Sequence, residues 1–152
     1  MFWACFNGSS KSPSLFWEKG WGSINKESYC SRIVPLCYGP ETYMQLVEGG
    51  APAHSAAYTL SELRAGEVHP IFWPVFSPDL NPIEAVWNKM KDWIELNHPD
   101  LPAGRQRSYD QLCDIVKQAW EAITPEYLES LVISMRERCQ AVIDAEGGYT
   151  KY

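Results

Sequence analysis

Short apolar runs and turn residues alternate along the first half of the chain. Residues 7–10 read Asn-Gly-Ser-Ser between two apolar runs, which predicts a β-hairpin. Asn25 is a good N-cap, and a helix that starts after it should end near Pro35. In chain order the predicted elements are strands at 2–6 and 14–17, a helix at 26–34, a strand at 43–47, a helix at 54–65 with a weak stripe of Ala57, Leu60 and Leu63, and a strand at 68–73.

Helical spacing dominates the second half. A strong amphipathic helix should begin at Pro82 with Asn81 as its N-cap, since proline favours the first helical position. Ser108 and Gln111 have the spacing of a capping box and predict the start of the next helix. The residues expected to face inward are Ile83, Val86, Trp87, Met90 and Ile94 in the first helix, Leu112, Val116, Ala119, Trp120 and Ile123 in the second, and Leu128, Leu131, Val132, Met135, Cys139 and Val142 in a last helix that restarts at Thr124-Pro125. This order predicts a single α/β domain over residues 1–152 with a small mixed sheet.

Composition narrows the function classes. The chain has 152 residues, 45% of them hydrophobic and 21% charged, which fits one globular domain and excludes a disordered chain. A net charge of −6 argues against a general polyanion binder, so any contact with DNA must use local basic groups. The five cysteines contain no CxxC pair and are expected to be reduced thiols. The longest apolar stretch, residues 70–76, is too short to span a membrane.

One stretch is far more specific than the rest. Residues 77–84 read Ser-Pro-Asp-Leu-Asn-Pro-Ile-Glu, which resembles the signature around the last catalytic carboxylate of Tc/mariner-type DDE transposases. Three other places resemble the same family: residues 48–54 its acidic strand end, residues 134–140 its late helix, and residues 147–152 its C-terminal tail. The resemblance extends over essentially the whole chain.

The resemblance implies a ribonuclease-H-like fold: a mixed sheet with flanking helices, here lacking the first strand, plus two C-terminal helices. In that family three carboxylates hold two Mg²⁺ or Mn²⁺ ions and cut DNA at transposon ends. Two metal ions stabilise the attacking and leaving oxygens of phosphodiester cleavage, and hard Mg²⁺ prefers the oxygens of Asp and Glu. The implied partners are transposon-end DNA and a second or related transposase, and the implied location is the nucleus. No membrane partner is expected.

Of the three carboxylates that the resemblance implies, only one is expected in this chain. The third falls on Glu84, and the slot of the second, after the strand at residues 43–47, falls on Gly49, which has no side chain to ligate a metal. Residues 50–83 separate these positions, a spacing typical of the family. Glu48 is adjacent but should face the opposite side of the strand, so it is a poor substitute. The strand of the first carboxylate and the family's N-terminal helix-turn-helix region are expected to be missing upstream of Met1. These differences predict a chain without cleavage activity.

Each candidate residue also has a purely structural interpretation. Glu84 could cap its helix together with Asn81, and Asp79 could accept hydrogen bonds within its turn rather than ligate a metal. His54 could contact DNA or a phosphate, or it could fix the start of its helix by hydrogen bonding. Trp73, Trp87, Trp93 and Trp120 could stack on bases, although core packing suits their spacing better.

Basic residues give the last set of candidates. Arg105 and Arg107, in a polar loop, are the candidate DNA contacts, and a solvated surface is their structural alternative. Arg136, Arg138 and Lys151 complete the possible basic surface. Two further functions remain open: a binding module for transposon DNA or a transposase, and a protein-interaction domain that uses the C-terminal helices.

Overall fold

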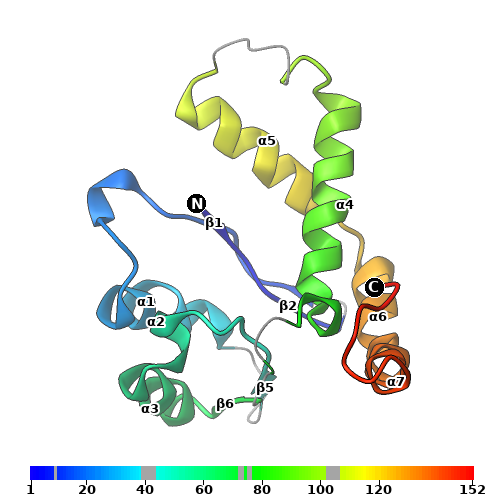
Figure 1. Cartoon of the computed structure of the whole chain (residues 1–152). Helices are drawn as coiled ribbons and strands as arrows, with labels where there is room; N and C mark the ends of the chain where they lie inside the picture. Colours follow the sequence, from blue (N-terminus) through cyan, green and yellow to red (C-terminus); the bar gives the residue numbers. More distant parts are fainter. Residues whose placement is uncertain (9, 39–43, 72–73, 75–76, 102–106) are drawn as a thin grey trace. The chain divides into compact units, whose positions relative to one another are not determined.

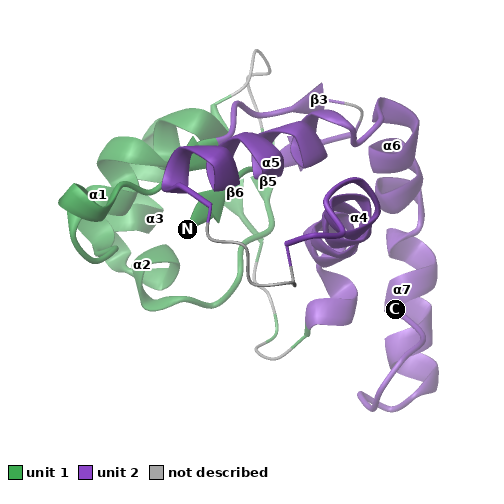
Figure 2. Ribbon diagram, turned by 90° about the horizontal axis from the view of Figure 1, so that it is seen from above, with its two compact units in different colours: residues 1–5, 15–77 green, residues 6–14, 78–152 purple. Residues whose placement is uncertain are grey.

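The computed structural model describes residues 1–8, 10–38, 44–71, 74, 77–101 and 107–152 (Figure 1). The chain divides into two compact units, shown in different colours in Figure 2. Unit 1 contains residues 1–5 and 15–77, and unit 2 contains residues 6–14 and 78–152.

Unit 1 carries two short β-ladders and three α-helices. Its elements are β1 (Phe2–Trp3), β4 (Leu15–Phe16), α1 (Lys26–Arg32), β5 (Met44–Leu46), α2 (Pro52–Ser55), α3 (Ala57–Ala65) and β6 (Val68–Pro70). β1 pairs antiparallel with β4, and β5 pairs parallel with β6. The described strands form separate two-stranded ladders, and none of them joins the two ladders of unit 1. The continuous mixed sheet that was expected is therefore not formed by these strands.

Local signals account for the helices of unit 1. The Asn25 side chain accepts a hydrogen bond from the Ser28 backbone and the Ser28 side chain accepts one from Asn25, which is a complete capping box. The helix expected over residues 54–65 begins earlier, at Pro52, and is interrupted at Ala56, whose ψ of 136° is extended. This interruption changes the buried face, so α3 buries Thr59 together with Leu63.

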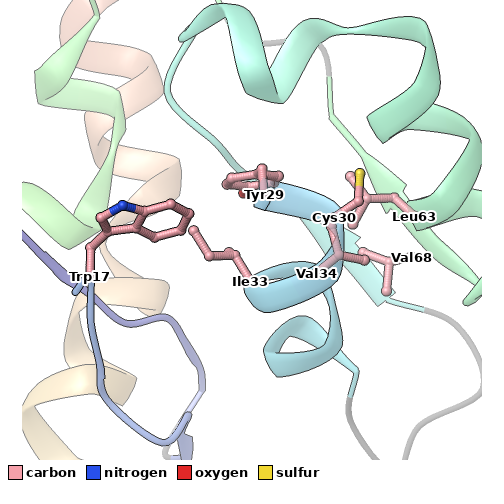
Figure 3. Packing of buried hydrophobic residues seen from close by; sticks show 7 residues of the cluster. All are labelled: Trp17, Tyr29, Cys30, Ile33, Val34, Leu63 and Val68. Atoms are coloured by element: carbon pink, nitrogen blue, oxygen red, sulfur yellow. The ribbon is translucent and has the colours of Figure 1, made fainter. Parts of the chain in front are cut away.

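The core of unit 1 gathers residues from α1, α3, β6 and the segment after β4. Figure 3 shows this cluster, which consists of Trp17, Tyr29, Cys30, Ile33, Val34, Leu63 and Val68. Removing these apolar groups from water is the main favourable contribution to folding of this unit. The core also places the hydroxyl end of Tyr29 near the end of β5, where the second carboxylate was sought.

Unit 2 begins with the tip of the predicted hairpin. β2 (Phe6–Asn7) pairs antiparallel with β3 (Ser10–Lys11), and the hairpin is thereby confirmed. The residue pairs of β1 with β4 and those of β2 with β3 differ in register by one residue. Pro13 lies in the segment between β3 and β4 and cannot donate a ladder hydrogen bond, which fits the interruption of the strand there.

The remaining elements of unit 2 are helical: α4 (Pro82–Asn97), α5 (Tyr109–Glu121), α6 (Pro125–Ile133) and α7 (Met135–Asp144). The predicted capping box of Ser108 and Gln111 is present at α5. The predicted inward face of α5 is largely confirmed, since Ala119, Trp120 and Ile123 are buried, but Leu112 is 42% exposed and Ile115 is buried instead. Residues 115, 119 and 123 recur at helical spacing and are all buried, so they define the true inward stripe.

The last helix is also different from the prediction. It is divided at Ser134 into α6 and α7, although the hydrogen bonds from the Ser134 amide to Ser130 and from the Arg138 amide to Ser134 continue the helical pattern across the division. Leu128 and Leu131 are buried as expected, whereas Cys139 is exposed and its neighbour Arg138 is buried. Val132, expected inward, is exposed as well.

Lys11 joins the hairpin tip to the end of α5. Its Nζ donates to the carbonyl oxygens of Trp120 and Ile123 at 2.8 Å each and to that of Glu121 at 3.1 Å. The last carbonyls of a helix lack partners within the helix, and a lysine there satisfies them and complements the helix dipole. This contact holds the β2–β3 hairpin within unit 2.

Candidate active site

Glu84 lies in the first turn of α4, and its side chain is exposed. Asn81 is the N-cap with an extended backbone (φ −96°, ψ 103°), and Pro82 follows it at the first helical position. The Asn81 side chain makes no capping hydrogen bond, so the predicted capping pair with Glu84 is not formed. The Glu84 amide instead donates to the Asn81 carbonyl at 3.1 Å. The carboxylate is therefore a free acidic group at the positive end of a helix dipole.

Asp79 connects the loop before α4 to the C-terminal part of unit 2. It lies in the 3-10 turn Pro78–Leu80, which Leu80 anchors by being buried. Its carboxylate accepts a hydrogen bond from Thr150 at 3.0 Å, and its backbone carbonyl accepts one from Arg138 at 2.8 Å. The predicted hydrogen bonding within the turn is thus replaced by long-range partners.

Glu48 follows β5 and is directed toward the core of unit 1. Tyr29 is only 1% exposed, and its hydroxyl donates a hydrogen bond to the Glu48 carboxylate. Burial raises the pKa of the Glu48 carboxyl above its usual 4.5, against the opposing effects of the Tyr29 hydrogen bond and of nearby His54. An environment that favours the neutral acid is unsuitable for a carboxylate that must bind a metal ion.

Gly49, the position predicted for the second carboxylate, is exposed. A Cβ added at this position would meet no atom within 4 Å, so the structure has room for a side chain here. The Gly49 carbonyl accepts a hydrogen bond from His54 Nδ1 at 2.5 Å, and the His54 ring packs against Tyr29 with centroids 4.7 Å apart. The structural interpretation of His54, which fixes the start of its helix, fits these contacts.

The metal site implied by the family resemblance does not fit these residues. Among the described residues, no group of three or more His, Cys, Asp or Glu side chains is placed to hold a metal ion. Gly49 offers no ligand, and Glu48 is engaged by Tyr29 in surroundings that favour its protonated form. Glu84 belongs to unit 2, and the other two positions belong to unit 1.

The raised pKa of Glu48 predicts a defined pH dependence. When the folded-state pKa of an acid exceeds the unfolded-state value, its stabilising contribution is complete below the unfolded value and is lost as the pH rises through the folded value. Glu48→Gln keeps an acceptor for Tyr29 and removes the titration. We therefore expect this variant to be more stable than the parent at about pH 8, with the advantage vanishing near pH 4.

Urea unfolding at several pH values measures this difference. Glu18→Gln, at an exposed position of the same unit, is the matched control and should leave the pH dependence unchanged. A parent and a Glu48→Gln variant whose midpoints differ by the same amount at every pH would contradict the assignment.

The basic candidates are mostly engaged by other residues. Arg107 forms an ion pair with Asp100 at 2.5 Å, and Arg105 lies outside the described residues. Arg138 is buried, so its inclusion in an exposed basic surface was wrong. Arg136 is exposed, and Lys151 lies 5.1 Å from the Tyr152 ring centroid.

The tryptophans mainly serve packing. Trp87 lies 6.1 Å from buried Trp120 between ring centroids, and Trp93 lies 5.9 Å from His98. Trp73 lies outside the described residues. So do Tyr43, the first residue of the strand predicted at 43–47, and residues 72–73, the end of the strand predicted at 68–73. The five cysteines are free thiols, with Cys30 and Cys37 buried.

The long-range contacts of three residues were not predicted from the sequence. Tyr29 lies within the helix predicted over residues 26–34 without a role of its own, Arg138 was considered only as a surface cation, and Lys11 was not considered. A tyrosine on a buried helix face is a usable signal, because its hydroxyl needs a partner when buried. The partners of Arg138 and Lys11 are distant in sequence, so no local pattern identifies them.

The chain has a mixed α/β fold that matches the ribonuclease-H-like catalytic domain of Mos1 transposase. The Mos1 catalytic domain solved with raltegravir and Mn superposes with a TM-score of 0.78 over 99% of this chain and 76% of that one, at 18% identity. The Mos1 paired-end complex with the left transposon end superposes with a TM-score of 0.82 over 99% of this chain and 44% of that one, at 18% identity. The shared fold does not by itself define a function.

The family follows from the sequence. The profile of the DDE superfamily endonucleases matches residues 24–102, just over half of the chain, and the chain belongs to this family. It is 31% identical to the transposable element Tc1 transposase of Caenorhabditis elegans and 30% identical to the Tcb2 transposase of Caenorhabditis briggsae, over its whole length. The chain spans 54% of the length of each of these relatives. The predicted membership of the Tc/mariner group is confirmed. Separately, no helix in the described ranges is long and apolar enough to cross a membrane.

Proposed function

We propose that this chain is a Tc/mariner-type DDE transposase domain that binds transposon-end DNA without cutting it. The observation that carries the proposal is Gly49 at the slot of the second carboxylate, beside a Glu48 that is committed to Tyr29. The Mos1 catalytic domain has been solved with Mn and with Mg. Such an ion would supply Lewis-acid chemistry at the scissile phosphate. Glu84 alone cannot hold two of these ions. A protein of this kind would act in the nucleus.

DNA nicking tests the loss of cleavage. A supercoiled plasmid that carries transposon ends, incubated with Mg²⁺ or Mn²⁺, should remain intact with the parent, with Glu84→Ala and with Gly49→Asp. The last variant has room for its new carboxylate, but with Glu84 it would supply only two of the three carboxylates that the family resemblance implies. A Tc1-type transposase serves as the active control. Metal-dependent nicking by the parent that disappears in Glu84→Ala would overturn this part of the proposal.

DNA binding tests the retained function. The Mos1 paired-end complex contains a transposon end, and binding of such DNA by this chain is the corresponding proposal. The net charge of −6 opposes binding, so the affinity should depend on a few local cations. Contacts of Arg105 and Arg107 with two phosphates would make the affinity fall about tenfold between about 50 and 200 mM salt.

Fluorescence anisotropy of a labelled transposon-end duplex measures this dependence. Arg105→Gln combined with Arg107→Gln should remove most of the salt sensitivity, whereas Arg64→Gln, at an exposed position of α3, should not. Absence of binding at the lowest salt would reject DNA binding and leave the nicking result unaffected.

A second candidate function rests on the C-terminal helices. Val132 and Ile133 of α6 and Ile143 of α7 expose apolar side chains, Ile133 by 71%. Large contiguous apolar patches mark protein-interaction sites, so this candidate requires the three side chains to lie together on one surface. Association of the chain that depends on concentration in sedimentation, and that Ile133→Ser abolishes, would favour this candidate over DNA binding.

A further inference from the structure

A buried arginine holds the loop that leads into α4. Arg138 lies on α7 and is only 6% exposed. Its Nη1 donates to the Asp79 carbonyl at 2.8 Å, and its Nε donates to Ser134 Oγ at 3.0 Å. A charged group is rarely buried without such partners, because losing its hydration is costly. The contact joins residues that are 59 positions apart in the chain.

The C-terminal tail contacts the same loop and the same arginine. α7 ends in a reversal with positive φ at Glu146 (50°) and Gly147 (80°), after which the tail folds back. Thr150 Oγ1 donates to the Asp79 carboxylate at 3.0 Å, so backbone and side chain of Asp79 are both held. The Tyr152 ring lies over the Arg138 guanidinium, 4.6 Å from Cζ to the ring centroid.

These contacts replace a missing local one. The N-cap Asn81 makes no side-chain hydrogen bond to the first turn of α4, although such a bond is what usually fixes a helix start. The start of α4 relies instead on the Asn81 amide, which donates to the Pro78 carbonyl at 2.9 Å within the 3-10 turn. That turn is the segment that Arg138 and Thr150 hold.

We propose that Arg138 is a positioning residue for Glu84, and that it acts with the Thr150–Tyr152 tail by fixing the turn at Asp79. Glu84 follows Asp79 by five residues and lies in the first turn of α4, so its position depends on where the helix starts. The inference rests on the proposed function only in that Glu84 is the surviving member of the carboxylate set. It concerns the order of the loop, and it is tested without cutting or binding DNA.

Hydrogen exchange of single backbone amides, measured by NMR on the whole chain, tests the proposal. The measured quantity is the exchange rate of the Asn81 and Glu84 amides divided by that of the Ala119 amide in α5. This ratio separates local opening of the loop from unfolding of the whole unit. Thr150→Val removes one hydroxyl and is matched by Thr150→Ser, which retains it. Tyr152→Ala removes the ring over Arg138 and is matched by Tyr152→Phe, and Arg138→Lys keeps the charge but loses the planar fork.

We expect the ratio to rise about three- to tenfold in Thr150→Val, Tyr152→Ala and Arg138→Lys, the change that loss of one net hydrogen bond produces. Thr150→Ser should match the parent, and Tyr152→Phe, which loses only the exposed hydrogen bond from its hydroxyl to Glu137, should stay close to it. The tail variants decide the matter if Arg138→Lys does not fold. An unchanged ratio in both Thr150→Val and Tyr152→Ala, or equal acceleration at Ala119, would overturn the proposal, whatever the nicking assay shows.

Discussion

Tyr29→Ala should lower the free energy of unfolding of unit 1 by about 4 kcal/mol, as expected for removal of a large buried aromatic side chain. Tyr29 is 1% exposed and lies in the core cluster with Ile33 and Leu63. Its removal leaves a cavity that neighbouring side chains fill only in part. It also leaves the Glu48 carboxyl without its hydroxyl donor, which adds the cost of a buried polar group without a partner.

Urea unfolding followed by circular dichroism measures the loss, and two variants separate its causes. Tyr29→Phe keeps the ring and removes only the hydroxyl, so it should cost about 1 kcal/mol. Tyr58→Ala removes a tyrosine of the same unit that is 45% exposed, and it should leave the midpoint close to that of the parent. A Tyr29→Ala variant as stable as Tyr29→Phe would show that the ring is not part of a packed core.

Arg138→Met should lower the free energy of unfolding of unit 2 by about 2–3 kcal/mol, because it removes a buried charged donor from two partly buried acceptors. Methionine keeps much of the aliphatic stem, so the loss reports on the guanidinium. The Asp79 carbonyl and Ser134 Oγ lose their bonds to Arg138, and Tyr152 loses the cation under its ring.

Arg136→Met is the matched control for this substitution. Arg136 lies two residues earlier on α7 and is exposed, so the same exchange of side chains should change the stability by less than about 0.5 kcal/mol. Thermal and urea unfolding of both variants gives the comparison. Equal losses in the two variants would mean that the helix, and not the buried network, responds to the substitution.

The helix starts were predicted where the determining contacts are local. The capping boxes at Asn25 and Ser108 join residues three positions apart, and both are present. The prediction failed where an inward position of a helix is taken by a charged residue. Arg138 follows the buried Leu131 by two helical turns and is itself buried, whereas its neighbour Cys139 is exposed. Hydrophobic periodicity counts only apolar residues, so it cannot anticipate a buried arginine.

The sequence by itself determined the family. The motif at residues 77–84 is sufficient to recognise the Tc/mariner group, which the comparisons confirm, whereas the assignment of Glu84 and Gly49 to two of the family's carboxylate positions stays a prediction. The net charge of −6 likewise follows from composition alone.

Only the tertiary structure decided what the side chains around these positions do. Glu48 is held by Tyr29, Asp79 by Arg138 and Thr150, and Arg107 by Asp100. A titratable side chain has many candidate partners in sequence, and packing selects among them by bringing distant segments within hydrogen-bonding distance. Burial then sets the strength of each contact, since a polar group removed from water must find its partner within the protein.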